Sequence, residues 1–526
     1  MSEEDAFKNM DNINIDNTPF YKRRVFLIAA AAGLILIAII IIVAATSGNG
    51  KDSKDGGKDS TDDGKDSKEN ICVIGEEMYC LTCVKNSRKC ATCNPGFIVN
   101  ENYNNGERCD IDYSINATYK TEKDNEEIDL LDSKYKDIIT GLIVDGVKKD
   151  IISYKYKFPK AGSYTVLLKT NLENISTLSG MFASNRNIIY IGTTKLFNIA
   201  TIVNMEQMFS ECPFLETANL LNLQGQNLQK MDKLFYGCSS LKKVDLLNFK
   251  ASQLNSISEM FLGCVSLTSV NLLNFSPEKL ESTESMFSDL PSLTHINLLN
   301  FKAENLKYMN KMFYNCQSLK SINLLNFESN SLVSMDEMCF NCYKLTSINL
   351  GNAITPNLES FTKMLGNCNS LQKVNLDMTT EKVKNMDQMF YNCQALTSFE
   401  FGKNFKASDT LSLKEMFYNC SSLEKFNYNF NTFTVSNIEK MFYKCSSLTR
   451  INLEVFTNTE NAHSMDEMFY YCNKLTSIDI STFTTSLTSI KLFNELPSNG
   501  KITVKENFLS LIKDQIPSSW KTSTTK

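Results

Sequence analysis

The residues with the clearest capacity for chemistry are the 17 cysteines, which form two groups of different spacing. Six of them lie close together and include two C-x-x-C pairs, a spacing that suits either a zinc site or a disulfide cluster. In an exported chain such a cluster favours disulfides, and we predict three bridges whose pairing the spacing leaves open. The six are Cys72, Cys80, Cys83, Cys90, Cys93 and Cys109.

The second group of cysteines recurs at a step of about 26 residues. Stacked repeats would bring successive thiols to about 5 Å, so disulfides or bound metal are two interpretations. Each cysteine also lies on the apolar side of its segment, where cysteine acts as a small buried hydrophobe, and this favours free thiols. Together with Cys339 their number is odd, which excludes complete pairing. The regular members are Cys212, Cys238, Cys264, Cys316, Cys342, Cys368, Cys393, Cys420, Cys445 and Cys472.

These cysteines end a repeated Met-Phe-x-x-Cys motif, and a period of 20–50 residues is typical of a stacked repeat architecture. In one repeat, Met309, Met312, Phe313 and Cys316 have the i, i+3, i+4, i+7 spacing of one helix face. Residues 319–324 then have the spacing of a short strand. We therefore predict coils of strand, turn, helix and turn, which are stable only when stacked because one coil buries too little apolar surface.

The strings "MFYNCQSLKSINLLNF" and "MFYKCSSLTRINLEVF" resemble the leucine-rich repeats of BspA-type surface proteins. The resemblance covers about 12 coils within 176–495. It implies an α/β repeat fold, a leucine-rich-repeat solenoid with a parallel sheet on one face and short helices on the other. It also implies adhesion at a microbial cell surface. The motif departs at Cys339 and Leu365, which replace Phe, and at Leu290, which replaces Cys.

Residues 25–46 form an uncharged apolar run that is long enough to cross a bilayer as a helix. Basic residues 22–24 precede it, so the positive-inside rule places 1–24 in the cytoplasm and the rest outside, as in a single-pass type II membrane protein with an extracellular C-terminus. A cleaved signal peptide is the alternative, because Val43-Ala44-Ala45 suits a signal peptidase. Both interpretations export the bulk of the chain.

Four further segments complete the predicted domains. Residues 47–70 are polar and charged, which predicts a disordered stalk. The string "CLTCVKNSRKCATCNPGFIV" within 71–110 resembles a furin-like cysteine-rich module. Residues 111–175 predict a β-rich N-terminal cap with a hairpin around Ala161-Gly162, and 496–526 predict a C-terminal cap and tail.

The predicted strands offer three outward rows. The fifth strand position is mostly Asn, which favours a structural amide ladder over a ligand site. The third position is mixed, as recognition surfaces on repeat frames are, and the seventh is Leu in five successive coils beginning at Leu221, either an exposed apolar stripe or core. The candidate partner-binding residues are Lys243, Leu247, Ser269, Leu273, His295, Leu299, Ser321, Leu325, Lys373, Lys425 and Arg450.

Other classes of function lack support in the sequence. The net charge of −5 leaves no basic footprint for nucleic acid, and nucleotide-binding, zinc-protease and serine-hydrolase motifs are absent. We predict no enzyme, cofactor or metal, and an extracellular protein or glycan as partner. A self-assembling coat and a pattern-recognition receptor are the alternatives. Asn116, Asn174, Asn274 and Asn419 begin glycosylation motifs.

Overall fold

The computed structural model describes 80–83, 90–93, 97–99, 109–111 and 114–526. Short gaps fall at 151, 194–198, 200, 221–224, 247–248, 250, 273–276, 299–302, 407, 428–434, 455, 457–458 and 488–489. The predicted tail, membrane anchor and stalk, 1–70, lie outside the described residues. Within the described residues, no helix is both long and apolar enough to cross a membrane.

In the cysteine-rich segment, only short strand pairs are described. β1 (Cys80–Cys83) and β2 (Cys90–Cys93) pair antiparallel, with Cys80 opposite Cys93 and Cys83 opposite Cys90. β3 (Phe97–Val99) and β4 (Cys109–Ile111) also pair antiparallel. Cys72 and the side chains of the other five cysteines lie outside the described residues, so the three disulfides stay a prediction.

An antiparallel sheet precedes the repeats and continues into them. β5 pairs on one side with β10 and on the other with β11, the first strand of the array. The sequence predicts a hairpin around Ala161-Gly162, and this is wrong, because β9 pairs with β6 whereas β10 pairs with β5 and β7. The elements are β5 (Ile115–Thr121), β6 (Glu126–Asp129), η1 (Ser133–Ile138), β7 (Ile139–Val144), β8 (Val147–Lys148), β9 (Lys155–Phe158) and β10 (Gly162–Thr170).

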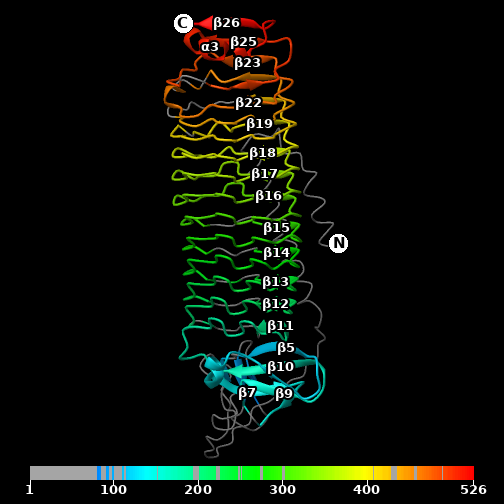
Figure 1. Cartoon of the computed structure of the whole chain (residues 1–526). Helices are drawn as coiled ribbons and strands as arrows, with labels where there is room; N and C mark the ends of the chain where they lie inside the picture. Colours follow the sequence, from blue (N-terminus) through cyan, green and yellow to red (C-terminus); the bar gives the residue numbers. More distant parts are fainter. Residues whose placement is uncertain are drawn as a thin grey trace, which may run out of the picture. The chain divides into compact units, whose positions relative to one another are not determined.

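The repeats form a stack of coils whose short strands run parallel (Figure 1). The strands fall into successive sheets along the array, and within each sheet neighbouring strands pair in register about 26 residues apart, as Ser321 does with Ser347. This confirms the predicted parallel-sheet solenoid. The strands are β11 (Ile188–Thr193), β12 (Thr217–Asn219), β13 (Lys243–Asp245), β14 (Ser269–Asn271), β15 (His295–Asn297), β16 (Ser321–Asn323), β17 (Ser347–Asn349), β18 (Lys373–Asn375), β19 (Ser398–Glu400), β20 (Lys425–Asn427), β21 (Arg450–Asn452) and β23 (Ser477–Ile480).

The predicted helix on the opposite side of each coil is wrong, because the Met-Phe-x-x-Cys segment is a run of turns. From Met309 to Asn315, every second backbone N–H donates to a carbonyl of the next coil. The N–H groups between them, such as that of Tyr314, close tight turns onto the carbonyl three residues back. Lys311 and Asn315 have positive φ angles of 54° and 60°, which lets the chain alternate between these two uses.

The spacing of the stack explains why these segments are not helices. Parallel strands lie about 4.8 Å apart, whereas an α-helix with its side chains is about 10 Å wide. The phenylalanine rings beside the turns repeat at nearly the strand spacing, with centroids 5.5 Å apart between Phe287 and Phe313. Helices could fit such coils only if the stack curved strongly away from them, so the coils use turns that hydrogen-bond to the next coil instead.

A C-terminal cap continues the sheet with two longer strands. β25 pairs parallel with β23, and β26 pairs parallel with β25. The single tryptophan, Trp520, packs here, and its indole N–H donates to the carbonyl of Pro497 at 2.8 Å. The remaining elements are η2 (Thr459–Asn461), β22 (Phe469–Tyr470), β24 (Phe493–Asn494), β25 (Lys501–Lys505), α3 (Glu506–Ile512), η3 (Lys513–Gln515) and β26 (Lys521–Thr525).

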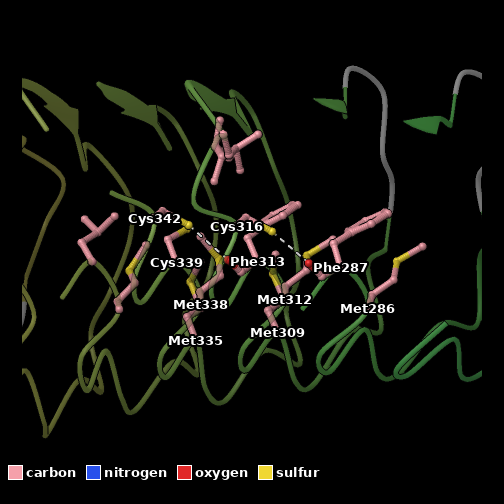
Figure 2. Close-up of a cluster of buried hydrophobic side chains, with 14 of the residues drawn as sticks. Met286, Phe287, Met309, Met312, Phe313, Cys316, Met335, Met338, Cys339 and Cys342 are labelled. Atoms are coloured by element: carbon pink, nitrogen blue, oxygen red, sulfur yellow. Dashed lines mark hydrogen bonds between the residues drawn. The ribbon is translucent and has the colours of Figure 1, made fainter. Parts of the chain in front are cut away.

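The core is a set of columns that run along the stack. Figure 2 shows Phe287 and Phe313 beside methionines of the same coils. The rings stack from Phe182 to Phe313 with successive centroids 5.4–5.6 Å apart. Cys339 and Leu365 interrupt the column, which resumes at Phe390. The coils at the interruption keep their turns and strands, so the departures in the motif change the packing and not the fold.

Candidate binding surface

The third strand position forms an exposed row along the strand face. The middle residue of each three-residue strand points into the core, as Ile322 does, so the residues on either side point outward. Most side chains at the third position are accordingly exposed, and Ser347 is half-buried. The described and exposed candidates are Lys243, Ser269, His295, Ser321, Lys373, Lys425 and Arg450.

The fifth strand position supplies the frame for this row. The amide of Asn349 donates to the Asn323 side-chain oxygen at 3.3 Å, and that of Asn375 donates to the Asn349 oxygen at 3.0 Å. The same oxygens accept backbone N–H groups of the following turn, as Asn349 accepts that of Gly351 at 3.0 Å. These asparagines end the strand and tie coil to coil, as the amide-ladder interpretation predicts.

The leucine row at the seventh position is described at one coil only. Leu325 begins the turn that follows the strand, and 45% of its surface is exposed. Its predecessor, Leu324, is buried, as are Leu298 and Leu350 at the same position. The strand therefore ends before the leucine pair, the first leucine enters the core, and Leu325 points outward. Leu221, Leu247, Leu273 and Leu299 lie outside the described residues, so a continuous apolar stripe stays a prediction.

The repeating cysteines are buried and free, as the small-hydrophobe interpretation predicts. Their thiols also act as hydrogen-bond donors. Cys316 donates to the Phe287 carbonyl oxygen of the preceding coil at 2.9 Å, and Cys342 donates to that of Phe313 at 3.1 Å (Figure 2). Burial raises the pKa of the Cys264 thiol to about 12. A thiol held in its neutral form is a poor nucleophile and metal ligand, so this column is structural.

The two histidines and the possible metal ligands of the described residues form no common site. His295 lies in the exposed strand row, and its Nδ1 lies 3.0 Å from the Thr294 hydroxyl. His463 lies many coils away, so the two histidines cannot act together. In the part of the chain that the structure describes, no group of three His, Cys, Asp or Glu residues could hold a metal ion.

The four glycosylation motifs differ in their surroundings. Asn174 is exposed, and Asn274 lies outside the described residues. Asn116 lies in β5, where its side-chain oxygen is buried without a hydrogen-bond partner. The Asn419 amide donates to the Asn392 oxygen at 2.8 Å within a second ladder between coils, so a glycan there would displace a structural bond. Of the three described sites, Asn174 is therefore the most accessible.

This second ladder lies on the turn side of the coils and is absent from the predictions made from the sequence. Asn392 and Asn367 both have positive φ, and the Asn392 amide donates to the Asn367 oxygen at 2.8 Å. The signal was present as an Asn or Gly directly before many of the repeating cysteines, since these residues tolerate the left-handed region best.

The coils also carry ion pairs between neighbours at positions outside the strands. Lys242 pairs with Glu216 at 2.9 Å, and Lys307 pairs with Glu281 at 2.8 Å. Lysines at the turns make similar, longer contacts, as Lys311 does with Glu337 at 3.8 Å. Exposed pairs of this kind add little stability, but they balance the charge of these lysines locally.

The fold and this surface define a repeat protein, a parallel β-solenoid with one exposed and variable strand face. A family profile described as "Mycoplasma protein of unknown function, DUF285" matches residues 176–296, 281–401 and 399–495, more than half of the chain. The chain therefore belongs to this family, and the matches coincide with the coils. No curated protein matches the sequence.

Solved structures give a weaker comparison. A chain of the structure titled "Crystal structure of TLR13-ssRNA13 complex" is 15% identical, with a TM-score of 0.17. The match covers 63% of this chain and 55% of that one, so this chain spans about half the length of its structural neighbour. At this TM-score the two structures do not superpose as one fold.

Proposed function

We propose that this protein is a cell-surface recognition protein that binds ligands of host cells, extracellular matrix or other microbes through the strand face of its coils, without catalysis. The observation that carries the proposal is the third strand position. There, exposed residues as different as Ser321, Lys373 and Arg450 stand on a frame that the coils repeat in register. A constant frame with variable side chains is how repeat proteins build recognition surfaces.

The surface location rests on sequence features. The uncharged run at 25–46 has the length of a membrane anchor, and the basic residues before it favour an extracellular C-terminus. Three disulfides in 71–110 and a glycan at Asn174 belong to the same proposal, because both require export.

The test compares two double variants of the full-length chain, displayed on a non-adherent cell. Ser321→Glu with Lys373→Glu changes the strand face, whereas Ser331→Glu with Lys384→Glu makes the same chemical change on another side of the coils. We expect the first pair to reduce the number of host cells or matrix-coated beads bound several-fold and the second to leave it unchanged. Equal binding by both variants and the parent, or no binding by the parent, contradicts the proposal.

A self-assembling surface coat is the second candidate, favoured by one observation. All five residues of β26 are exposed, and this strand is the outer edge of the sheet, which could pair with another chain. The Thr524→Pro variant removes one backbone donor from this edge. Assembly that increases with the concentration of the full-length protein and stops in this variant would favour the coat over recognition.

A further inference from the structure

The last strands of the sheet bring cationic side chains into one row. In β21, β23, β25 and β26 the register places Arg450 beside Ser477, Ser477 beside Lys501, and Lys501 beside Lys521. The three cationic side chains are exposed. Lys425 extends the row, since β20 lies against β21. At about 4.8 Å per strand, the row from Lys425 to Lys521 is about 19 Å long.

The middle of this row is an open depression of about 430 Å³. Two cationic groups and three hydroxyls surround it, which is a donor-rich lining that suits an anion with several oxygen atoms. Gly500 contributes backbone only, because a β-carbon there would lie 2.5 Å from the Trp520 ring. The lining residues are Thr449, Arg450, Thr476, Ser477, Gly500 and Lys501.

The charges of this row are not neutralised by the protein. Elsewhere in the array, lysines pair with glutamates of neighbouring coils, as Lys307 does with Glu281. Among the described residues, by contrast, Arg450, Lys501 and Lys521 form no ion pair. The next row of the same face holds one carboxylate, that of Asp479, which accepts the Ser481 backbone N–H at 3.0 Å. Adjacent unpaired cations such as Lys501 and Lys521 repel each other, and a bound anion would remove this cost.

From this geometry we infer that the strand row Lys425–Arg450–Ser477–Lys501–Lys521 binds a linear sulfated polysaccharide. The inference deepens the recognition function proposed above and rests on it, by naming the partner of one part of the strand face. A linear polyanion matches a straight row of cations, and the hydroxyls can bond to sugar hydroxyls and sulfate oxygens. The lining has no aromatic side chain on which nucleic acid bases could stack, and no apolar side chain that could enter a membrane.

The test measures binding of the full-length protein to immobilised heparin, used as a sulfated probe. Arg450→Gln with Lys501→Gln removes two charges from the row, and Lys307→Gln with Lys384→Gln removes two charges from the paired lysines elsewhere on the coils. We expect the first variant to bind heparin about tenfold more weakly, which corresponds to about 1.4 kcal/mol, and the control to bind like the parent. Binding should also weaken as salt is raised, and desulfated heparin should not compete.

The outcomes separate this inference from the proposed function. Heparin binding that is absent, or that is lost equally in both variants, overturns the inference, while adhesion that still depends on Ser321 and Lys373 would support the recognition function. Tighter binding of single-stranded DNA or anionic vesicles than of heparin through Arg450 and Lys501 also overturns it. Heparin binding through the row without any adhesion supports the inference and contradicts the proposed function.

Discussion

At the scale of single residues, the repeating cysteine combines three properties that no other side chain offers together. It is small enough for a column whose coils lie about 5 Å apart, apolar enough to be buried, and able to donate a weak hydrogen bond. The Phe313 carbonyl accepts both the Cys342 thiol and the Cys316 backbone N–H, so the thiol uses a second lone pair of a buried oxygen. Leu290, which stands at the cysteine position of its coil, keeps the apolar contact but has no hydrogen-bond donor.

Because these thiols are buried in their neutral form, we predict that the protein becomes less stable at alkaline pH. Burial raises the pKa of Cys264 and of Cys472 from 9.0 to about 12. Between these pH values the unfolded chain loses thiol protons that the folded chain keeps, so the free energy of unfolding falls as pH rises from about 9 to about 12. Each such thiol contributes up to about 1.4 kcal/mol per pH unit in this window, and the contribution is fully present below pH 9. Urea unfolding at several pH values measures it.

The matched variant replaces both residues, Cys264→Ala with Cys472→Ala. It should be less stable than the parent at pH 8, because it loses two hydrogen bonds and some packing. Its stability should nevertheless fall less steeply above pH 9. Identical slopes for parent and variant would show that these two thiols titrate in the folded state as they do in the unfolded chain.

At the scale of elements, the sequence predicted the strands well and the segment opposite them badly. The positions of the buried residues from Met309 to Cys316 were predictable, because a run of tight turns and a helix both return side chains to one face every three to four residues. Periodicity alone cannot separate the two. What decides between them is the 4.8 Å stacking distance, a property of neighbouring coils that no single repeat encodes.

The candidate surface was predictable for a similar reason and to a similar extent. Strand alternation correctly put Ser321 and Lys373 on the outside and Ile322 inside. The continuation of the row through Lys501 and Lys521 was not foreseen, because the cap departs from the repeat motif and its register is set by pairing with β23. The hairpin at Ala161-Gly162 failed because long-range partners, not the local turn, chose the pairing of β9 and β10.

At turn positions with positive φ, we predict that substitution by glycine does not lower stability. Lys363 is half-exposed with a φ of 55°, and its N–H donates to the Asp387 carbonyl of the next coil at 2.8 Å. Lys363→Gly should therefore keep or raise stability, whereas Lys363→Val should lower it by about 1–2 kcal/mol, because a β-branched side chain clashes in this region. Chemical denaturation of both variants provides the measurement.

Lys344 provides the control, since its side chain is exposed and its φ angle is not positive. Valine there should have little effect. If residues around Lys363 were helical after all, glycine would be the more damaging of the two substitutions, by about 1 kcal/mol relative to a good helix former.

At the scale of the whole molecule, stability comes from contacts between neighbours, so the ends of the array should differ from its middle. The chain has one tryptophan, Trp520, which is 6% exposed in the C-terminal cap. Its fluorescence therefore reports on one end. We expect the emission to shift to the red at a lower urea concentration than the loss of β-sheet circular dichroism, because β26, the last strand, has a neighbour on one side only. Coincident transitions would instead indicate that the array unfolds as one unit.

The strands lie across the direction in which the coils succeed one another (Figure 1), and in the residues that the structure describes the bonds of a coil go mainly to the coils beside it. Tension between the two ends of the array would consequently load one interface at a time and peel coils off in sequence. Each released coil of about 26 residues frees up to roughly 90 Å of chain. A stack held at one end and pulled by a ligand at the other would thus lengthen in discrete steps, and it would dissipate a sudden load without detaching.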